Sequence, residues 1–274
     1  MPLDPTIIGF IAELVRERAA IVLKKEKFYI IESKLQRFAS ENNITDLRKF
    51  YDDLKRFPLL QDRLIDYMTI NETSFFREAR QFDLLKAQVF PDLVTRRRTE
   101  KRLRIWSAAC SSGQEPYSLA ITVAETRALD GFEVAVLASD LSERMLKVAR
   151  AGQYNQLEIN RGLSPSAVKK YFICEQDKWT VKPHLRQTVQ FRRINLLHDV
   201  RGLPKFDVIW LRNVLIYFDV EVKKQVVGNL IKVLRPDGYF FVSTTENLFG
   251  ISDHLELVRE WGASVYRLKS AAQR

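Results

Sequence analysis

The 274-residue sequence contains few of the residues that build metal centres and disulfide frameworks. Its 2 cysteines and 3 histidines are too few for a dense zinc or disulfide arrangement, so we expect no metal site and a reducing, cytoplasmic location. The first residues, Met1-Pro2-Leu3-Asp4, lack the basic region of a signal peptide. No apolar run approaches the roughly 18 residues that a membrane-spanning helix needs, so we expect no direct membrane insertion.

Glycine is missing from the places where nucleotide-binding loops need it. The run of residues 107–116, which follows a predicted strand, contains glycine only at position 113. It therefore matches neither G-x-G-x-x-G nor the phosphate-binding G-x-x-x-x-G-K-[ST], and a nucleoside triphosphate is disfavoured. Its small residues would still let a ligand approach the backbone at the carboxyl edge of a sheet, although small residues also serve tight packing.

Acidic residues are outnumbered, and the net charge is +10. The excess lies in two segments, residues 76–104 with a net charge of +5 and residues 167–205 with +6, whereas residues 1–75 are neutral. Basic segments indicate an anionic partner such as nucleic acid, a membrane surface or an acidic protein. The alternative interpretation is a solvated surface without a partner.

Apolar periodicity divides the chain into a helical part and an α/β part. Up to about residue 70 the apolar stripes have helical spacing, and Thr45 is expected to cap one of the helices. From Leu103 onward strands alternate with helices, which indicates a parallel sheet covered on both faces. The predicted elements are a helix at 81–97, strands at 103–109, 133–139, 206–211, 239–245 and 265–268, helices at 116–127, 143–151 and 220–234, and a turn at 235–238.

These patterns predict a helical domain at residues 1–75, a linker helix at 76–100 and an α/β domain at 101–274. One stretch of the α/β part departs from the alternation. Residues 178–181 and 188–191 are typical of short antiparallel strands, so we expect a small antiparallel β insert at about 172–194.

Two polar segments follow strands of the predicted sheet and point to a nucleoside site. Asp140 ends the second strand, where doubly wound folds place an acid on ribose hydroxyls, but it could instead cap the helix that starts near Ser142. The segment 211–218, Leu-Arg-Asn-Val-Leu-Ile-Tyr-Phe, ends the fourth main strand on the same edge. Together with the small-residue turn, they indicate a site of the S-adenosylmethionine type.

Six ordered motifs, spread over nearly the whole chain, carry a family resemblance. They are Asn71-Glu72-Thr73-Ser74-Phe75-Phe76-Arg77, Trp106-Ser107-Ala108-Ala109 with Ser112-Gly113-Gln114-Glu115-Pro116-Tyr117-Ser118, Ala138-Ser139-Asp140, Asn195-Leu196-Leu197, Arg212-Asn213-Val214 with Ile216-Tyr217-Phe218, and Pro236-Asp237-Gly238. With these motifs the chain closely resembles the bacterial chemotaxis receptor methyltransferases, the CheR family. The resemblance implies a Rossmann-like class I methyltransferase domain behind an N-terminal helical domain, with a small antiparallel β insert.

The resemblance also implies a reaction and its residues. Members of the family are protein-glutamate O-methyltransferases that use S-adenosyl-L-methionine, release S-adenosyl-L-homocysteine and esterify glutamates on cytoplasmic helices of chemoreceptors. By motif match, Arg77 and Tyr217 would lie near the methyl group and the substrate carboxylate. The implied cofactor contacts are Asn71, Thr73, Arg77, Glu115, Asp140, Asn195, Leu196, Arg212 and Asn213.

The chemistry agrees with that assignment. A glutamate side chain has a pKa near ~4.3 and is already an anion at neutral pH, so the scarcity of histidine is no objection. Arg77 could hold the carboxylate through its planar guanidinium, and the preceding pair Phe75-Phe76 suits a lid over a cofactor. Glu115 could face the cationic end of the cofactor, or simply favour the first turn of a helix. Cys110 is interpreted as a packing residue.

Docking to a glutamate-rich receptor helix should be electrostatic. The resemblance points to the N-terminal helices, where Lys34 and Arg37 lie one turn apart, while the basic insert adds a weaker attraction. The insert has only 18 residues between Phe172 and Phe191 and lacks glycine, which departs from members whose insert binds a receptor C-terminal peptide. We expect a monomer.

Two other functions remain to be weighed. A nucleic-acid methyltransferase would fit the basic charge, but the strand end Arg212-Asn213-Val214-Leu215 lacks the [N/D]-P-P-[Y/F] element that holds a base amino group. No nucleic-acid partner is therefore expected. A non-catalytic adaptor that only docks to receptors would not need the cofactor residues, all of which are present.

Overall fold

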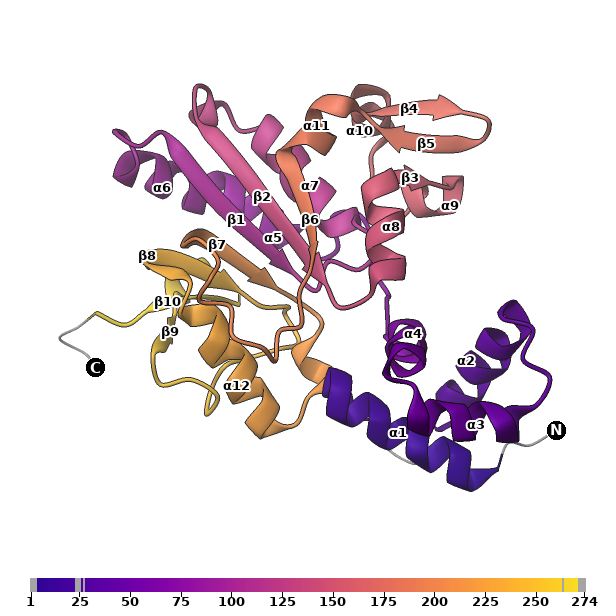
Figure 1. The fold of residues 1–274 in the computed structure, drawn as a ribbon. Helices are drawn as coiled ribbons and strands as arrows, with labels where there is room; N and C mark the ends of the chain where they lie inside the picture. Colours follow the sequence, from indigo (N-terminus) through magenta and orange to yellow (C-terminus); the bar gives the residue numbers. More distant parts are fainter. Residues whose placement is uncertain (1–3, 23–25, 27, 263, 271–274) are drawn as a thin grey trace.

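The N-terminal helices gather beside an α/β domain in the computed structural model, which describes residues 4–22, 26, 28–262 and 264–270 (Figure 1). Among these residues no helix is long and apolar enough to cross a membrane. The first four helices are α1 (Pro5–Ala19), α2 (Phe28–Glu41), α3 (Leu47–Arg56) and α4 (Pro58–Met68). Their apolar stripes form one core, in which Ile11, Leu35, Leu54 and Leu64 are fully buried.

The cap of α3 differs from the sequence prediction. Asp46, not Thr45, is the N-cap residue, because its carboxylate accepts hydrogen bonds from the backbone N–H groups of Arg48 and Lys49 at 2.9 and 3.0 Å. A carboxylate can satisfy two of the free N–H groups at a helix start, and it is also favoured by the helix dipole.

The helix predicted at 81–97 is present, but it is not uniform. It consists of α5 (Arg80–Leu84), one wide turn, η2 (Leu85–Val89), and α6 (Phe90–Arg96). Its buried side chains, including Phe82 and Phe90, join the core on one face of the main sheet.

The main sheet has seven strands in the order β6-β2-β1-β7-β8-β10-β9. The five from β6 to β8 are parallel, and β10 and β9 add an antiparallel edge. This sheet confirms the predicted Rossmann-like architecture. The strands are β1 (Arg102–Ala108), β2 (Glu133–Asp140), β6 (Val189–Arg193), β7 (Phe206–Leu211), β8 (Leu234–Phe241), β9 (Leu255–Leu257) and β10 (Val265–Leu268).

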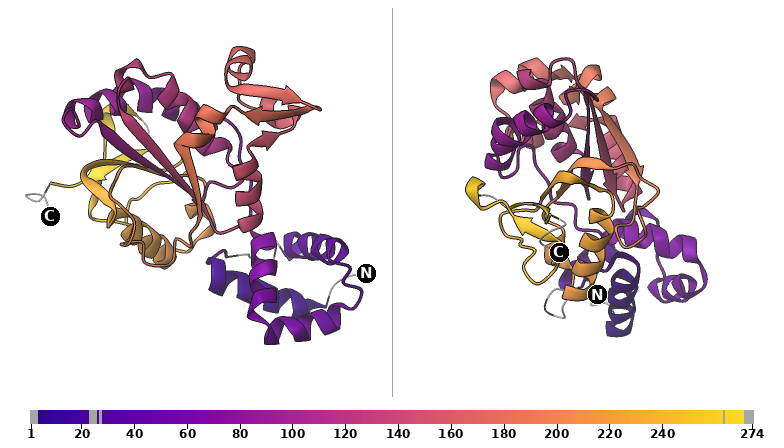
Figure 2. Two further views of the ribbon diagram at one scale, coloured as in Figure 1. Left: turned by 45° about the horizontal axis from the view of Figure 1, so that its top comes forward. Right: turned by 90° about the vertical axis from the view of Figure 1, so that its left-hand side faces the viewer.

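Helices cover both faces of this sheet, as the alternation of strands and helices predicts (Figure 2). One core lies between the sheet and α5, α6, α7 (Gln114–Ala124) and α8 (Glu143–Ala151), and the other lies between the sheet and α12 (Val220–Ile231). Every residue of β7 is buried, as expected for a central parallel strand. The parallel strands all end at one edge, which brings the polar residues after β1, β2 and β7 together. Short 3-10 turns are η3 (Arg127–Leu129), η4 (Leu215–Tyr217) and η5 (Arg259–Trp261).

The β insert is a separate three-stranded antiparallel sheet that projects from the main sheet (Figure 1). Its order is β3-β5-β4, with β3 (Gln153–Tyr154), β4 (Phe172–Glu175) and β5 (Lys178–Val181). The prediction that residues 188–191 belong to it was wrong, because β6 pairs parallel with β2 in the main sheet. The short helices of this region are α9 (Gln156–Asn160), α10 (Pro165–Tyr171) and α11 (Pro183–Thr188).

The turn predicted at 235–238 lies instead within β8, where the pairing with β7 shifts register between Phe206 and Val208.

An ion-pair network fixes this irregular region. Asp207, 1% exposed, accepts hydrogen bonds from Arg97 Nε and from the backbone N–H of Arg104, both at 2.8 Å. Arg97 also binds Asp237 through Nη1 at 2.8 Å and Nη2 at 2.6 Å. The network ties the end of α6 to β1, β7 and β8.

We predict that Asp207→Ala lowers the free energy of unfolding by about 3–5 kcal/mol, because it removes the more deeply buried of the two carboxylates that compensate the charge of Arg97. Urea denaturation followed by circular dichroism measures the change. Asp199→Ala is the matched control, since Asp199 pairs with Arg201 on the surface and its removal should leave the transition midpoint nearly unchanged. Equal midpoints for the two variants would contradict the prediction.

Candidate functional site

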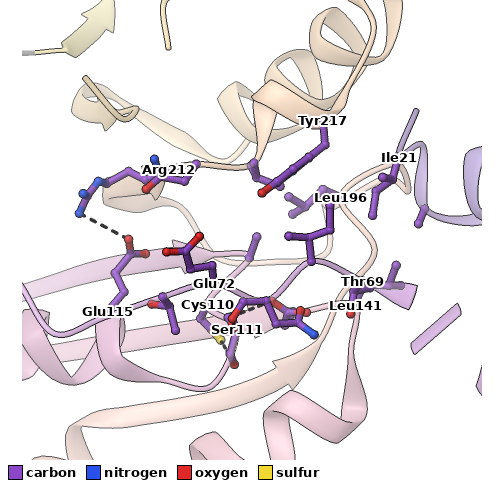
Figure 3. Close-up of a pocket in the computed structure, with 18 of the residues that line it drawn as sticks. Ile21, Thr69, Glu72, Cys110, Ser111, Glu115, Leu141, Leu196, Arg212 and Tyr217 are labelled. Carbon is purple, nitrogen blue, oxygen red and sulfur yellow. Dashed lines mark hydrogen bonds and ion pairs between the residues drawn. The ribbon is translucent and has the colours of Figure 1, made fainter. Parts of the chain in front are cut away.

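A pocket opens at the carboxyl edge of β1, β2 and β7 and is closed on one side by the end of α1 and the segment 69–77 (Figure 3). All ten site residues predicted from the sequence line it. They are Asn71, Thr73, Arg77, Glu115, Asp140, Asn195, Leu196, Arg212, Asn213 and Tyr217. In Figure 3, Arg212 and Glu115 face one another at one end of the pocket, and Leu196 and Ile21 lie at the other.

The turn after β1 brings its backbone to the pocket through unusual conformations. Ala109, Ser111 and Gly113 have φ angles of +62°, +49° and +95°, in the left-handed region that small residues tolerate best. A Cβ on Gly113 would lie 2.8 Å from the Cβ of Ala149 on α8, so only glycine fits there. Ser111 Oγ donates a hydrogen bond to the carbonyl of Asn71 at 3.0 Å, which fastens the turn to the segment 69–77.

Asp140 joins two turns of the pocket. Its Oδ2 accepts a hydrogen bond from the N–H of Ser111 at 2.8 Å, and its Oδ1 accepts one from the N–H of Ser142 at 2.9 Å. The alternative that Asp140 caps α8 is wrong, because Ser142 is the N-cap residue and binds the N–H of Met145. Burial raises the pKa of Asp140, while these hydrogen bonds act in the opposite direction. Each carboxylate oxygen can accept a further bond, so the group can still receive ribose hydroxyls.

A buried ion pair lies at one end of the pocket. Arg212 Nη1 lies 3.5 Å from Glu115 Oε2, and the two side chains are 0% and 14% exposed. Arg212 Nη2 donates to the carbonyl of Arg77 at 2.6 Å, but Nε and Nη1 have no hydrogen-bond acceptor in the part of the chain that the structure describes. Glu115 accepts a hydrogen bond from Ser107 Oγ at 2.8 Å. Unused donors beside a buried acid fit a ligand that carries both a carboxylate and an amino group.

Burial raises the pKa of Glu115 to about 7, although the Arg212 guanidinium and the Ser107 hydroxyl act in the opposite direction. Near neutral pH this carboxyl group is therefore close to half ionised, and a cation placed beside it would favour the ionised form.

Arg77 and Tyr217, the two residues predicted to lie near the reacting groups, both line the pocket. Arg77 Nη1 donates to the carbonyl of Glu72 at 3.1 Å. Burial raises the pKa of Tyr217, and the charge of Arg77 counteracts this.

The aromatic pair before Arg77 anchors its turn and does not form the lid that the sequence suggested. Phe75 is 1% exposed and packs edge-on against Tyr154 and Phe172 of the insert, and Phe76 packs on Phe82. Neither ring lines the pocket. A Cβ on Gly162 would lie 1.9 Å from the carbonyl oxygen of Phe75, so the chain beside this turn needs glycine.

No motif in the sequence indicates that the end of α1 contributes to the pocket. Ala19 and Ile21 line it, and the N–H of Val22 donates to the carbonyl of Tyr217 at 3.0 Å.

Asn195 lines the pocket too, but its side chain forms hydrogen bonds within the protein. Its Nδ2 donates to the carbonyl of Arg18 at 3.1 Å, and its Oδ1 accepts from the N–H of Leu197. Only the folded arrangement brings these distant segments together.

Lys34 does not face solvent as the sequence suggested. Its Nζ donates to the carbonyls of Tyr67, Met68 and Thr69, where it satisfies the end of α4. Burial lowers the pKa of Lys34 to about 8, and the charge of Arg144 adds to this. Arg37 is 77% exposed and pairs with Glu41. Lys34 is therefore a structural residue, and Arg37 is the one residue of the predicted pair whose side chain is exposed.

Cys110 lines the pocket but is 1% exposed. Burial raises the pKa of its thiol well above the usual value, with Asp140 and Glu115 adding to this, which keeps it protonated. A protonated thiol is a poor nucleophile, consistent with a packing residue. Across the described ranges, no group of three or more histidine, cysteine, aspartate or glutamate side chains is placed to hold a metal ion.

Two family models match the chain. One, described as the all-alpha domain of CheR methyltransferases, matches residues 8–69, and the other, described as the SAM-binding domain, matches residues 71–262. The chain is 39% identical over 267 residues to chemotaxis protein methyltransferase 1 of Pseudomonas aeruginosa, covering 93% of this chain and 95% of the relative. It is 37% identical over 268 residues to chemotaxis protein methyltransferase Cher2 of Pseudomonas putida, with coverages of 93% and 95%. The chemotaxis protein methyltransferase of Salmonella typhimurium is 33% identical over 268 residues, with coverages of 94% and 88%.

We predict that the affinity for S-adenosylmethionine rises with pH through 7. The cofactor is a cation, and the ionised fraction of Glu115, with its pKa of about 7, grows from about 0.1 at pH 6 to about 0.75 at pH 7.5. The association constant should therefore rise about five- to tenfold over this range, with release of a proton, in isothermal titration calorimetry.

Glu115→Gln should weaken binding and flatten this pH dependence. The matched control is Glu133→Gln, whose carboxylate is 63% exposed and pairs with Arg102 outside the pocket. A wild-type affinity that is the same at pH 6 and pH 7.5 would show that Glu115 does not contact the cation.

Proposed function

The chain belongs to the CheR methyltransferase family, and we propose that it methylates glutamate side chains on cytoplasmic helices of chemoreceptors. The products would be glutamate methyl esters and S-adenosyl-L-homocysteine. The single observation that supports this best is the pocket itself, whose lining combines a buried acid–guanidinium pair with Arg77 and Tyr217. The relatives are named chemotaxis protein methyltransferases, which supports a role in chemotaxis adaptation.

The pocket residues suit the parts of S-adenosylmethionine. We assign the ribose hydroxyls to Asp140, the amino group to Glu115, and the carboxylate to the unused donors of Arg212. Leu196 and Ile21 offer apolar surface at the opposite end for the adenine ring. Asn71, Thr73, Asn195 and Asn213 would complete the site, with Asn195 acting through the loop that it holds.

The reaction needs positioning more than acid–base catalysis. The bound cofactor supplies a methyl group on a positively charged sulfur, which leaves as a neutral thioether when a carboxylate oxygen bonds to the methyl carbon. Because the substrate glutamate is already ionised, no proton has to move. Arg77 would orient the carboxylate through its planar guanidinium, and Tyr217 would align the carboxylate with the methyl group. Exclusion of water by the end of α1 would strengthen both contacts.

We also propose a cytoplasmic, monomeric enzyme that meets its receptor through basic side chains. Arg37 on α2 and the basic residues of the segment 167–205 are the surface charges that could attract a glutamate-rich helix. Such attraction acts within about 10 Å at 0.1 M salt, so it would guide docking without entering the pocket.

The proposed reaction predicts a base-labile product. Incubation with S-adenosylmethionine labelled in its methyl group and membranes that contain chemoreceptors should label the receptor band, and mild alkali should release the label as methanol, because esters hydrolyse where N-methyl groups do not. Membranes without receptors and total RNA are the controls. Alkali-stable label, or label in RNA, would contradict glutamate esterification.

The proposed roles of Arg77 and Tyr217 predict a loss of rate that exceeds the loss of affinity. Tyr217→Phe should lower kcat about tenfold or more while the Kd for S-adenosylhomocysteine changes less than about threefold, because the hydroxyl acts in the transition state. Arg77→Ala should behave similarly, with some loss of cofactor affinity because Arg77 lines the pocket. Full kcat in Tyr217→Phe would remove the hydroxyl from the mechanism. Tyr239→Phe, whose hydroxyl binds Asp92 away from the pocket, is the control.

A further inference from the structure

Glu246 lies in the loop after β8 and does not line the pocket, yet the residue is only 6% exposed. Its Oε2 accepts hydrogen bonds from the backbone N–H groups of Asn213 at 2.9 Å and Ser243 at 3.0 Å. Its Oε1 accepts one from the N–H of Ile216 at 3.3 Å. Three main-chain donors therefore converge on one buried carboxylate, one more than the Asp46 carboxylate accepts at the start of α3.

Two of these donors belong to the turn at residues 213–217, which carries Asn213 and Tyr217. The backbone of Asn213 is left-handed, with φ +56°, and the turn ends in η4. A left-handed asparagine costs conformational free energy and persists only where its surroundings hold it. Because Glu246 binds the turn at both Asn213 and Ile216, it fixes the direction in which the following Tyr217 side chain leaves the backbone.

A second carboxylate, Glu78, acts on the same region in a different way. Its Oε2 accepts from the N–H of Thr244 at 2.8 Å, and its Oε1 lies 3.4 Å from Asn213 Nδ2 and 3.5 Å from Arg212 Nη2. Glu78 therefore reaches the side chains of Arg212 and Asn213, whereas Glu246 binds the main chain of the turn itself.

We propose that Glu246 is a positioning residue for methyl transfer: its carboxylate holds the 213–217 turn so that Tyr217 is aligned with the substrate carboxylate. This inference rests on the proposed function, because it acts through Tyr217. The side chain must be a carboxylate for a chemical reason. Two oxygens can accept all three N–H groups, whereas a glutamine amide offers one oxygen and turns its own N–H donors toward the backbone donors.

The test compares Glu246→Gln with Glu256→Gln, a matched acid-to-amide change on β9, where Glu256 pairs with Arg267 on the surface. Hydrogen exchange of a peptide that covers residues 212–218, read by mass spectrometry, reports on the turn without any substrate. In Glu246→Gln the amides of Asn213 and Ile216 should exchange about tenfold faster, with a melting temperature close to that of the control.

Kinetics then test whether the turn serves catalysis. In Glu246→Gln, kcat should fall about 10- to 100-fold, as expected when a reacting group moves by about 1 Å, and the Kd for S-adenosylhomocysteine should stay within about threefold of wild type. Glu246→Asp should restore part of kcat, because it returns a carboxylate. Adding Tyr217→Phe to Glu246→Gln should lower kcat little further, since both changes disable the same hydroxyl.

Two results would overturn the inference. One is unchanged exchange and unchanged kcat in Glu246→Gln. The other is a fully multiplicative loss of kcat in the double variant, which would mean that Glu246 does not act through Tyr217. If wild-type protein transferred no methyl group to receptors, the proposed function would fail, and the exchange of the 212–218 amides alone would decide whether Glu246 holds the turn.

Discussion

The site depends on the ion pairs and the hydrogen bond of the buried Arg212 guanidinium. Its side chain is 0% exposed, lies over the rings of Phe82 and Trp210, and reaches Glu115 on α7, Glu78 and the carbonyl of Arg77. A buried cation is tolerated only where acids and carbonyl oxygens surround it. Two carboxylates and the turn that carries Arg77 therefore gather around Arg212 at the end of β7. The requirement to compensate this one buried charge determines how the residues of the pocket are arranged.

Some of the pocket residues were predictable because they follow a topological rule, whereas Asn71, Thr73 and Arg77 were predicted only from the family resemblance. The turn after β1, Asp140 at the end of β2 and the segment after β7 each lie at the carboxyl end of a strand of a parallel sheet, and such strand ends share one edge. The motifs supplied residue identities, and the alternation of strands and helices supplied their common location. Neither needed information about contacts between distant segments.

What the sequence could not predict depends on such distant contacts. β6 resembled an antiparallel insert strand because its parallel partner β2 lies about 50 residues earlier, and nothing local distinguishes the two pairings. The spacing of Lys34 along α2 predicts an exposed side chain. Only the folded position of the carbonyl groups at the end of α4 explains why Lys34 is half-buried. In the same way, Ile21 and Glu246 act on the pocket from segments that carry no motif of their own.

The close approach of Gly162 to the backbone of Phe75 couples the position of the insert to that of the turn that carries Arg77. Any side chain at position 162 would meet the Phe75 carbonyl, whereas the neighbouring Arg161 is 62% exposed and forms a surface pair with Glu72. Two adjacent positions thus have opposite tolerance to substitution. Substitutions at position 161 can therefore change the surface of the insert. The glycine at position 162 must be kept, because it holds the insert at a fixed distance from the pocket.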